Sequence, residues 1–267
     1  MRARAPIALL PLACLLSCAL PYTPAPLAGN WQIQAGTAIT SPPTAPYLVG
    51  ALQGSNSALT GTFNLLQPGS GVTPQGISLT GTYNPATGNL TLVPAPPQVG
   101  GVSVMLSVPA DPTGVATGTI GFSCGVCANG FSLPAVGVQI APLNGTYYGT
   151  LTESASTLTS PIPSGTGSLT LTQSTTANAD GSFSLTGMFD FTGGGCESSL
   201  PLSGSISGEG IILNYPSPSP GWSGINFAAS TNPSATQITA TSVVFTNSPC
   251  GISNAGSTTF AGTLTRQ

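Results

Sequence analysis

Charged side chains are scarce in this chain and account for only 3% of its 267 residues. The sequence has no histidine and no lysine, because its cationic residues are Arg2, Arg4 and Arg266. The lack of histidine excludes Ser-His-Asp and Cys-His catalysis and removes the commonest transition-metal ligand. The lack of lysine excludes a Schiff-base lysine and a P-loop. Much familiar enzymology is therefore excluded, and we expect no metal and no cofactor.

Residues that favour helices on a protein surface are also scarce. An average soluble domain has roughly a quarter of its residues charged, whereas Gly, Ser, Thr, Asn and Pro fill the polar positions of this chain. Such a composition favours strands and turns. The hydrophobic content of 40% is sufficient for a packed core. The formal net charge of −3 makes binding to nucleic acid phosphates very unfavourable.

The N-terminal segment has the parts of a signal peptide. Arg2 and Arg4 precede an apolar run, residues 5–16, which is shorter than the roughly 20 residues needed to span a bilayer. The run ends in Leu15-Leu16-Ser17-Cys18, which resembles the lipobox of bacterial lipoproteins. In that family the cysteine thiol is diacylated, and its α-amine is acylated after cleavage before the cysteine.

This resemblance implies a signal peptide at 1–17 and lipidation of Cys18, which would attach the protein to a membrane. A Pro- and Ala-rich spacer would complete the segment 18–27. Ala19 after the cysteine, in place of an aspartate, favours the outer membrane of a Gram-negative-type cell envelope. Cys14 fits the lipobox less well, because Pro11 stands at the place of the expected Leu or Val. An ordinary secretory signal is the alternative.

Period-two alternation of apolar and polar residues dominates the rest of the chain. Ile77, Leu79, Gly81 and Tyr83 would share one face of a strand, and Phe183 to Phe191 repeats the pattern. Turn signals separate such runs at short intervals, which is typical of antiparallel hairpins. No stretch after the spacer has helical spacing. We therefore predict an all-β protein.

A glycine recurs between two apolar residues at strand spacing. Glycine weakens a strand unless its missing side chain has a use. The use that we infer is curvature, together with room for a side chain from the opposite wall. Curved strands predict closed barrels, and flat sandwich sheets are the alternative. The pattern occurs at Leu27-Gly29-Trp31, Leu48-Gly50-Leu52, Leu59-Gly61-Phe63, Leu79-Gly81-Tyr83, Leu143-Gly145-Tyr147, Leu185-Gly187-Phe189, Leu202-Gly204-Ile206 and Phe260-Gly262-Leu264.

The chain also looks duplicated. Residues 27–31 open one half and residues 143–147 open the other, each with a glycine two residues before an aromatic ring. We predict two tandem domains, 28–142 and 143–267, with about eight strands each. Gly29-Asn30-Trp31 and the later Leu-Thr-Gly-Thr-Tyr-Asn of 79–84 resemble the meander barrels of lipocalins and avidins. Only these short motifs match, so the resemblance implies a fold and no particular ligand.

Four cysteines lie beyond the N-terminal segment, and three disulfide connectivities are open to them. An oxidising compartment favours disulfides, and we predict Cys124 with Cys127 and Cys196 with Cys250, one bridge in each half. The Cys-x-x-Cys spacing also occurs in redox sites, but such a site needs a helix start. A zinc site is less favoured, because only one pair is closely spaced.

Two carboxylates and two aromatic rings are candidate functional residues. Glu153 and Asp190 could act as acid and base on a glycoside if they faced one cleft about 5 to 10 Å apart. The alternative is that both are solvated surface groups. Tyr215 and Trp222 flank a Pro-rich loop and could form the rim of a ligand pocket, or cover the end of a core.

Together these observations predict a lipid-anchored, non-catalytic protein of the cell envelope. It would bind a ligand or partner, or act as a surface scaffold, with a small apolar or carbohydrate ligand as the expected chemistry. The first alternative is a polysaccharide hydrolase that uses Glu153 and Asp190. The second is an adhesive or self-assembling coat component, because few charges would block pairing between strand edges.

Overall fold

The computed structural model describes residues 27–69, 74–96, 100–109, 114–124, 130–157, 163–193, 196–215, 224–246 and 256–267. For Cys124 and Cys196 it describes the backbone alone. Every regular element within these ranges is a β-strand, as the composition predicts. Among these residues, no helix is long and apolar enough to cross a membrane.

The first eight strands form one closed antiparallel barrel in which each strand pairs with its neighbours in sequence. The barrel closes because β1 pairs with β8, for example at Gln32 opposite Val138. Its strands are β1 (Gly29–Ala35), β2 (Tyr47–Ser55), β3 (Ala58–Leu66), β4 (Gln75–Asn84), β5 (Asn89–Pro94), β6 (Gly100–Ser107), β7 (Ala116–Cys124) and β8 (Phe131–Ile140).

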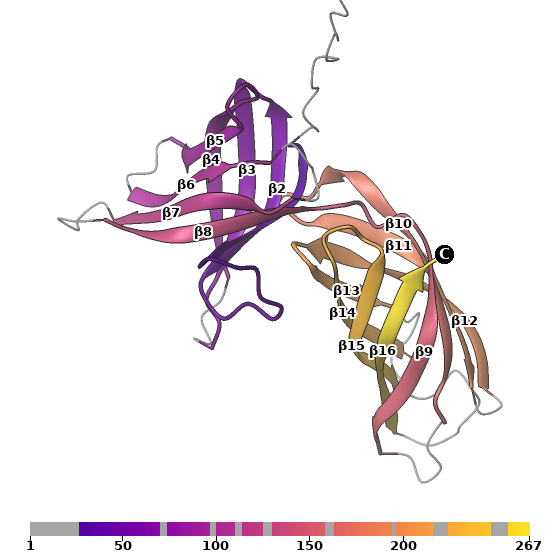
Figure 1. Ribbon diagram of the computed structural model, residues 1–267. Coiled ribbons are helices and arrows are strands. Elements are labelled where there is room, and N and C mark those ends of the chain that lie inside the picture. The colour runs from indigo at the N-terminus through magenta and orange to yellow at the C-terminus, as the bar shows by residue number, and fades with distance from the viewer. Residues whose placement is uncertain are drawn as a thin grey trace, which may run out of the picture.

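The next eight strands repeat this meander and close where β16 pairs with β9. The prediction of two tandem eight-stranded barrels is therefore confirmed (Figure 1). The sandwich alternative is wrong, because the first and last strands of each half pair. The strands are β9 (Gly145–Ser156), β10 (Gly165–Ala177), β11 (Phe183–Gly193), β12 (Cys196–Ser207), β13 (Gly210–Asn214), β14 (Gly224–Thr231), β15 (Gln237–Thr246) and β16 (Ser257–Arg266).

The interior of each barrel is packed with the side chains that the alternation assigned to it. In β4, Ile77, Leu79 and Tyr83 are buried, and Ser78 and Thr82 on the other face are exposed. Trp31 is 2% exposed in the first barrel, and its Nε1 donates to the carbonyl of Leu27 at 2.7 Å. The second barrel is filled by phenylalanines in mutual contact, namely Phe189, Phe191, Phe227, Phe245 and Phe260.

The glycines of the repeated pattern allow neighbouring strands to approach closely. A Cβ added to Gly81 in β4 would collide with the carbonyl oxygen of Thr91 in β5. The sequence suggested that such a glycine makes room for a side chain of the opposite wall. At five of the eight glycines the space is instead taken mainly by the backbone of the adjacent strand, which follows from the strong coiling of a small barrel. These five are Gly50, Gly81, Gly187, Gly204 and Gly262, whereas side chains lie at the added Cβ of Gly29, Gly61 and Gly145.

This close approach predicts different results for two glycines of the same strand. Gly81→Ala should lower the free energy of unfolding by about 1 to 3 kcal/mol, because the backbone of β5 must move to admit the methyl group. Gly76→Ala is the matched control, since nothing lies within 4 Å of its added Cβ. Urea denaturation of both variants measures the difference, and equal midpoints would contradict this explanation of the glycines.

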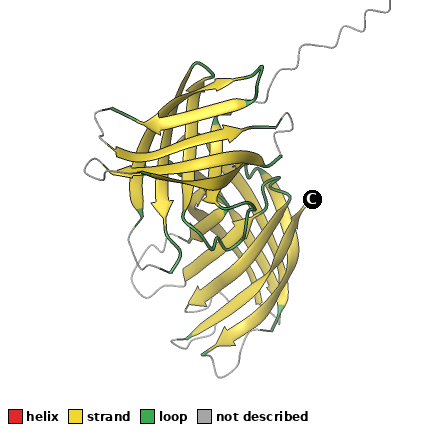
Figure 2. Cartoon of the chain, turned by 60° about the vertical axis from the view of Figure 1, so that its left-hand side comes forward, coloured by secondary structure: helices red, strands yellow, loops and turns green. Residues whose placement is uncertain are grey.

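The two barrels are docked against each other (Figures 1 and 2). Ala51 of β2 and Val138 and Ile140 of β8 point outward from the first barrel, yet each is at most 2% exposed. These three side chains belong to the same apolar cluster as the core of the second barrel. A buried apolar contact between domains opposes relative motion, so we expect the pair to behave as one unit.

Polar side chains of the first barrel also bind turns of the second. Asn30 donates from Nδ2 to the carbonyl of Gly208 and accepts from its N–H at Oδ1, both at 2.8 Å. Gly208 has a φ of +56° in the turn between β12 and β13, and a Cβ there would approach Gln32 and Val49. At another turn, Asn64 Nδ2 donates to the carbonyl of Asp180 at 2.9 Å. These contacts fix how the two barrels meet.

Candidate functional site between the two barrels

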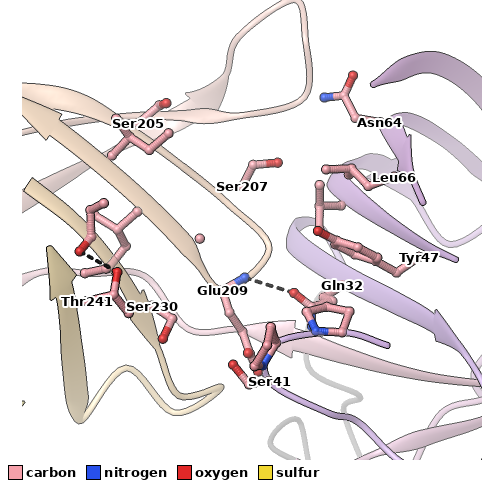
Figure 3. A pocket seen from close by; sticks show the side chains of 18 of the residues that line it. Gln32, Ser41, Tyr47, Asn64, Leu66, Ser205, Ser207, Glu209, Ser230 and Thr241 are labelled. Carbon is pink, nitrogen blue, oxygen red and sulfur yellow. Dashed lines mark hydrogen bonds between the residues drawn. The ribbon is translucent and has the colours of Figure 1, made fainter. Parts of the chain in front are cut away.

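A cleft of about 820 Å³ lies where the outer walls of the two barrels face each other (Figure 3). Its volume is within the range of about 300 to 1,000 Å³ that is typical of ligand pockets. The first barrel contributes Gln32, Ser41, Pro42, Pro43, Tyr47, Val49, Asn64, Leu66 and Pro74. The second barrel contributes Ser205, Ser207, Glu209, Gly210, Ile211, Ile212, Ala228, Ala229, Ser230, Thr239 and Thr241.

Gln32 supplies a buried amide to this cleft. It lies on the outer face of β1, and its side chain is only 2% exposed. Its Oε1 accepts from the backbone N–H of Glu209 at 3.2 Å, and this bond fixes which end of the amide is oxygen. Its Nε2 has no hydrogen-bond partner. The cleft therefore contains a buried N–H donor that the protein does not satisfy.

Ser207 supplies a second unsatisfied group on the opposite wall. It is the last residue of β12, directly before the turn that docks on the first barrel. Its Oγ is buried and has no hydrogen-bond partner. Buried polar groups in native proteins are nearly always paired with protein, water or ligand. Two unpaired groups that line one cleft therefore indicate a place where another molecule supplies the missing partners.

Among the described residues that line the cleft, Glu209 is the only acidic or basic one. Its side chain is 7% exposed, and this burial raises the pKa of the carboxyl above its ordinary value. A hydrogen bond with the Ser41 side chain acts in the opposite direction and lowers that pKa by a smaller amount. The carboxyl of Glu209 consequently keeps its proton to a higher pH than an exposed glutamate, and the neutral acid is a hydrogen-bond donor.

The loop after β1 contributes part of the cleft lining. Gln34 anchors this loop, because its Nε2 donates to Thr40 Oγ1 at 2.6 Å and its Oε1 accepts from the Thr40 N–H at 3.1 Å. The loop places Ser41, Pro42 and Pro43 at the cleft. The cleft therefore has a preformed rim, which lowers the entropic cost of binding.

Apolar side chains complete the walls. Tyr47, Val49 and Leu66 come from the first barrel and Ile212 from the second. Partial burial raises the pKa of the Tyr47 phenol, so this group is neutral at ordinary pH. The described lining offers hydrogen bonds and apolar contact.

The two carboxylates proposed for hydrolysis are not brought together at this cleft. Asp190 is exposed on the outer face of β11, between the buried Phe189 and Phe191. Glu153 lies near the end of β9, opposite the buried Phe260 in register, and therefore on the inward side of the barrel wall. The two carboxyls point to opposite sides of the wall, and neither lines the cleft.

The remaining candidates have separate positions. Tyr215 is partly buried and packs against the core of the second barrel, and its N–H donates to the carbonyl of Ile225 at 3.0 Å. Trp222, Cys18, Cys127 and Cys250 lie outside the described residues, so the disulfide pairing and the lipid anchor stay predictions. No group of three or more His, Cys, Asp or Glu side chains in the described ranges could hold a metal ion.

The sequence patterns did not predict this cleft, although one signal of it was present. In residues 47–52 and 135–140, the side chains on both faces of the strand are largely apolar. The other strands of the first barrel are apolar on one face only. A strand that is apolar on both faces is usually buried on both faces. This rule predicts that β2 and β8 form the surface on which the second barrel docks.

Protein-family models and curated proteins do not match this chain. By its fold and cleft, the chain is a double meander barrel with a pocket between the barrels.

Proposed function

We propose that this chain is a lipid-anchored, non-catalytic protein of the cell envelope that binds a small ligand between its two barrels. The observation that carries the binding proposal is the pair of buried, unpartnered groups, Gln32 Nε2 and Ser207 Oγ, in one cleft. Leaving such groups unpaired costs about 1 to 3 kcal/mol each. A molecule that pairs with them, either water or a ligand, recovers part of this free energy.

The packed barrel interiors also support a site between the barrels. Lipocalin-like barrels can hold a ligand inside, but in this chain large buried side chains point into the interiors, namely Trp31 and Phe63 in the first barrel and the phenylalanines in the second. The adhesive alternative was motivated by exposed strand edges. It loses that motivation, because every strand in the described ranges pairs with a neighbour on each side.

The membrane half of the proposal rests on the lipobox and predicts the site of lipidation. Full-length chain expressed in a bacterium should give a processed protein that begins at Cys18, with a mass above that of the polypeptide by a diacylglyceryl and an acyl group. Two or more acyl chains anchor stably, so this protein should fractionate with membranes.

The control variants test the choice of cysteine. Cys18→Ser should abolish the mass increase and the membrane fractionation, and Cys14→Ser should leave both unchanged. Intact-mass spectrometry of the membrane fraction is the measurement. An unmodified mature N-terminus at another residue would contradict the anchor, and it would leave the binding proposal to be judged by the cleft.

A further inference from the structure

The chemistry of the cleft identifies the class of its ligand, if the ligand-binding function proposed above holds. We propose that the cleft binds a neutral saccharide of about two or three units, whose oxygens accept hydrogen bonds from Gln32 Nε2 and Ser207 Oγ. This assignment rests on three properties of the walls, which are their charge, their hydroxyl groups and their apolar patches.

The charge of the walls excludes an anionic ligand. Glu209 and Tyr47 are the titratable residues among the described lining, and no described cation lies there. An anion would lose its water without gaining a positive partner, which is costly. A cation would need an ionised Glu209, and the burial of that side chain at 7% exposure opposes ionisation. A neutral ligand carries neither cost.

Hydroxyl groups are distributed along the whole second-barrel wall. Ser205 and Ser207 stand two residues apart on β12, and Ser230, Thr239 and Thr241 continue the wall on β14 and β15. Residues two apart on a strand share a face and lie about 7 Å from each other. Hydroxyls both donate and accept hydrogen bonds. A ligand that offers several hydroxyls over a similar length matches this wall better than a purely apolar molecule.

The apolar patches suit the C–H faces of sugar rings. Tyr47 and Leu66 lie on the first-barrel side (Figure 3). Ile212 of β13, which is 60% exposed, belongs to the second-barrel lining. Gln32 and Asn64 of the first barrel add amides to the lining. Sites with a few fixed polar groups among apolar side chains give orientation and specificity together. A pyranose ring has the same combination of apolar faces and polar edges.

The test uses the complete mature chain and calorimetric titration with defined probes. Neutral saccharides are represented by maltose, cellobiose, lactose and N,N′-diacetylchitobiose. Digalacturonic acid is the anionic comparison ligand, and the chitosan dimer is the cationic one. The apolar comparison ligand is 1-octanol. We expect at least one of the neutral saccharides to bind to the protein, and neither of the charged saccharides to bind.

Ser207→Ala locates that binding in the cleft. It should weaken the affinity for the neutral saccharide about threefold to tenfold, the usual effect of one lost neutral hydrogen bond. Its melting temperature should not fall, because the removed hydroxyl has no partner within the protein. Ser198→Ala is the matched control. It removes a buried, unpartnered hydroxyl from the same strand, outside the cleft, and should leave the affinity unchanged.

The outcomes separate this inference from the proposed function. Binding of 1-octanol or a charged probe that depends on Ser207, without saccharide binding, would overturn the ligand class and leave a ligand-binding cleft. Saccharide binding that Ser207→Ala does not weaken would overturn the site. Binding by none of the probes would count against both proposals.

Discussion

Replacing Phe245 by alanine is expected to lower the free energy of unfolding by about 3 to 5 kcal/mol, because the cavity left by a phenyl ring in a packed core collapses only in part. Phe245 is 1% exposed. Its ring centroid lies 5.3 Å from Phe191, 5.3 Å from Phe260 and 6.2 Å from Phe189, so one truncation removes contacts with three other rings. Aromatic pairs contribute beyond the area that they bury.

A surface aromatic residue of the same barrel provides the control. Tyr148 is 48% exposed on the outer face of β9, and Tyr148→Ala should change the free energy of unfolding by no more than about 0.5 kcal/mol. Urea denaturation followed by circular dichroism measures both variants. Equal destabilisation by the two would mean that the interior of the second barrel is not the packed aromatic core described above.

The barrels could be predicted from the sequence because their signal is local. The alternation of Phe183, Leu185, Phe189 and Phe191 fixes which face of β11 is inward, and all four side chains are buried. A period of two needs only neighbouring residues to be read. The repetition of this pattern with glycines predicted curvature, and curvature over eight strands predicts closure.

The cleft could not be predicted in the same way because its residues are distant in sequence. Gln32 and Glu209 are 177 positions apart, and nothing near either residue indicates the hydrogen bond between them. Glu209 lies in the turn between β12 and β13, where a carboxylate is usually solvated. It becomes buried only because its turn docks on another barrel. Docking depends on the shape of two complete surfaces, which no local pattern specifies.

Comparison of the two halves shows that the duplication is unequal at this surface. Ala51 stands opposite Asn30, and Thr170 stands opposite Thr146 at the corresponding place of the second barrel. Ala51 is buried against the second barrel, whereas Thr170 is exposed. One half therefore carries a docking face and the other carries a polar surface at the same place. This difference limits the association to one pair of barrels.

This inequality supplies a paired test of the docking. Ala51→Glu is expected to destabilise the contact between the barrels by about 3 to 5 kcal/mol, because it places a carboxylate without a partner at a position that is 1% exposed. Thr170→Glu adds the same group at the equivalent exposed position of the other half, and it should have little effect.

Small-angle scattering and calorimetry distinguish the two variants. For Ala51→Glu we expect a larger radius of gyration, separate melting of the two barrels and loss of binding in the cleft, since the cleft needs both walls. Each barrel should still fold, because its strands close on themselves and its core is internal. Retention of a single transition and of the original dimensions by Ala51→Glu would show that the barrels are not held together at this face. The cleft would then need another explanation for its geometry.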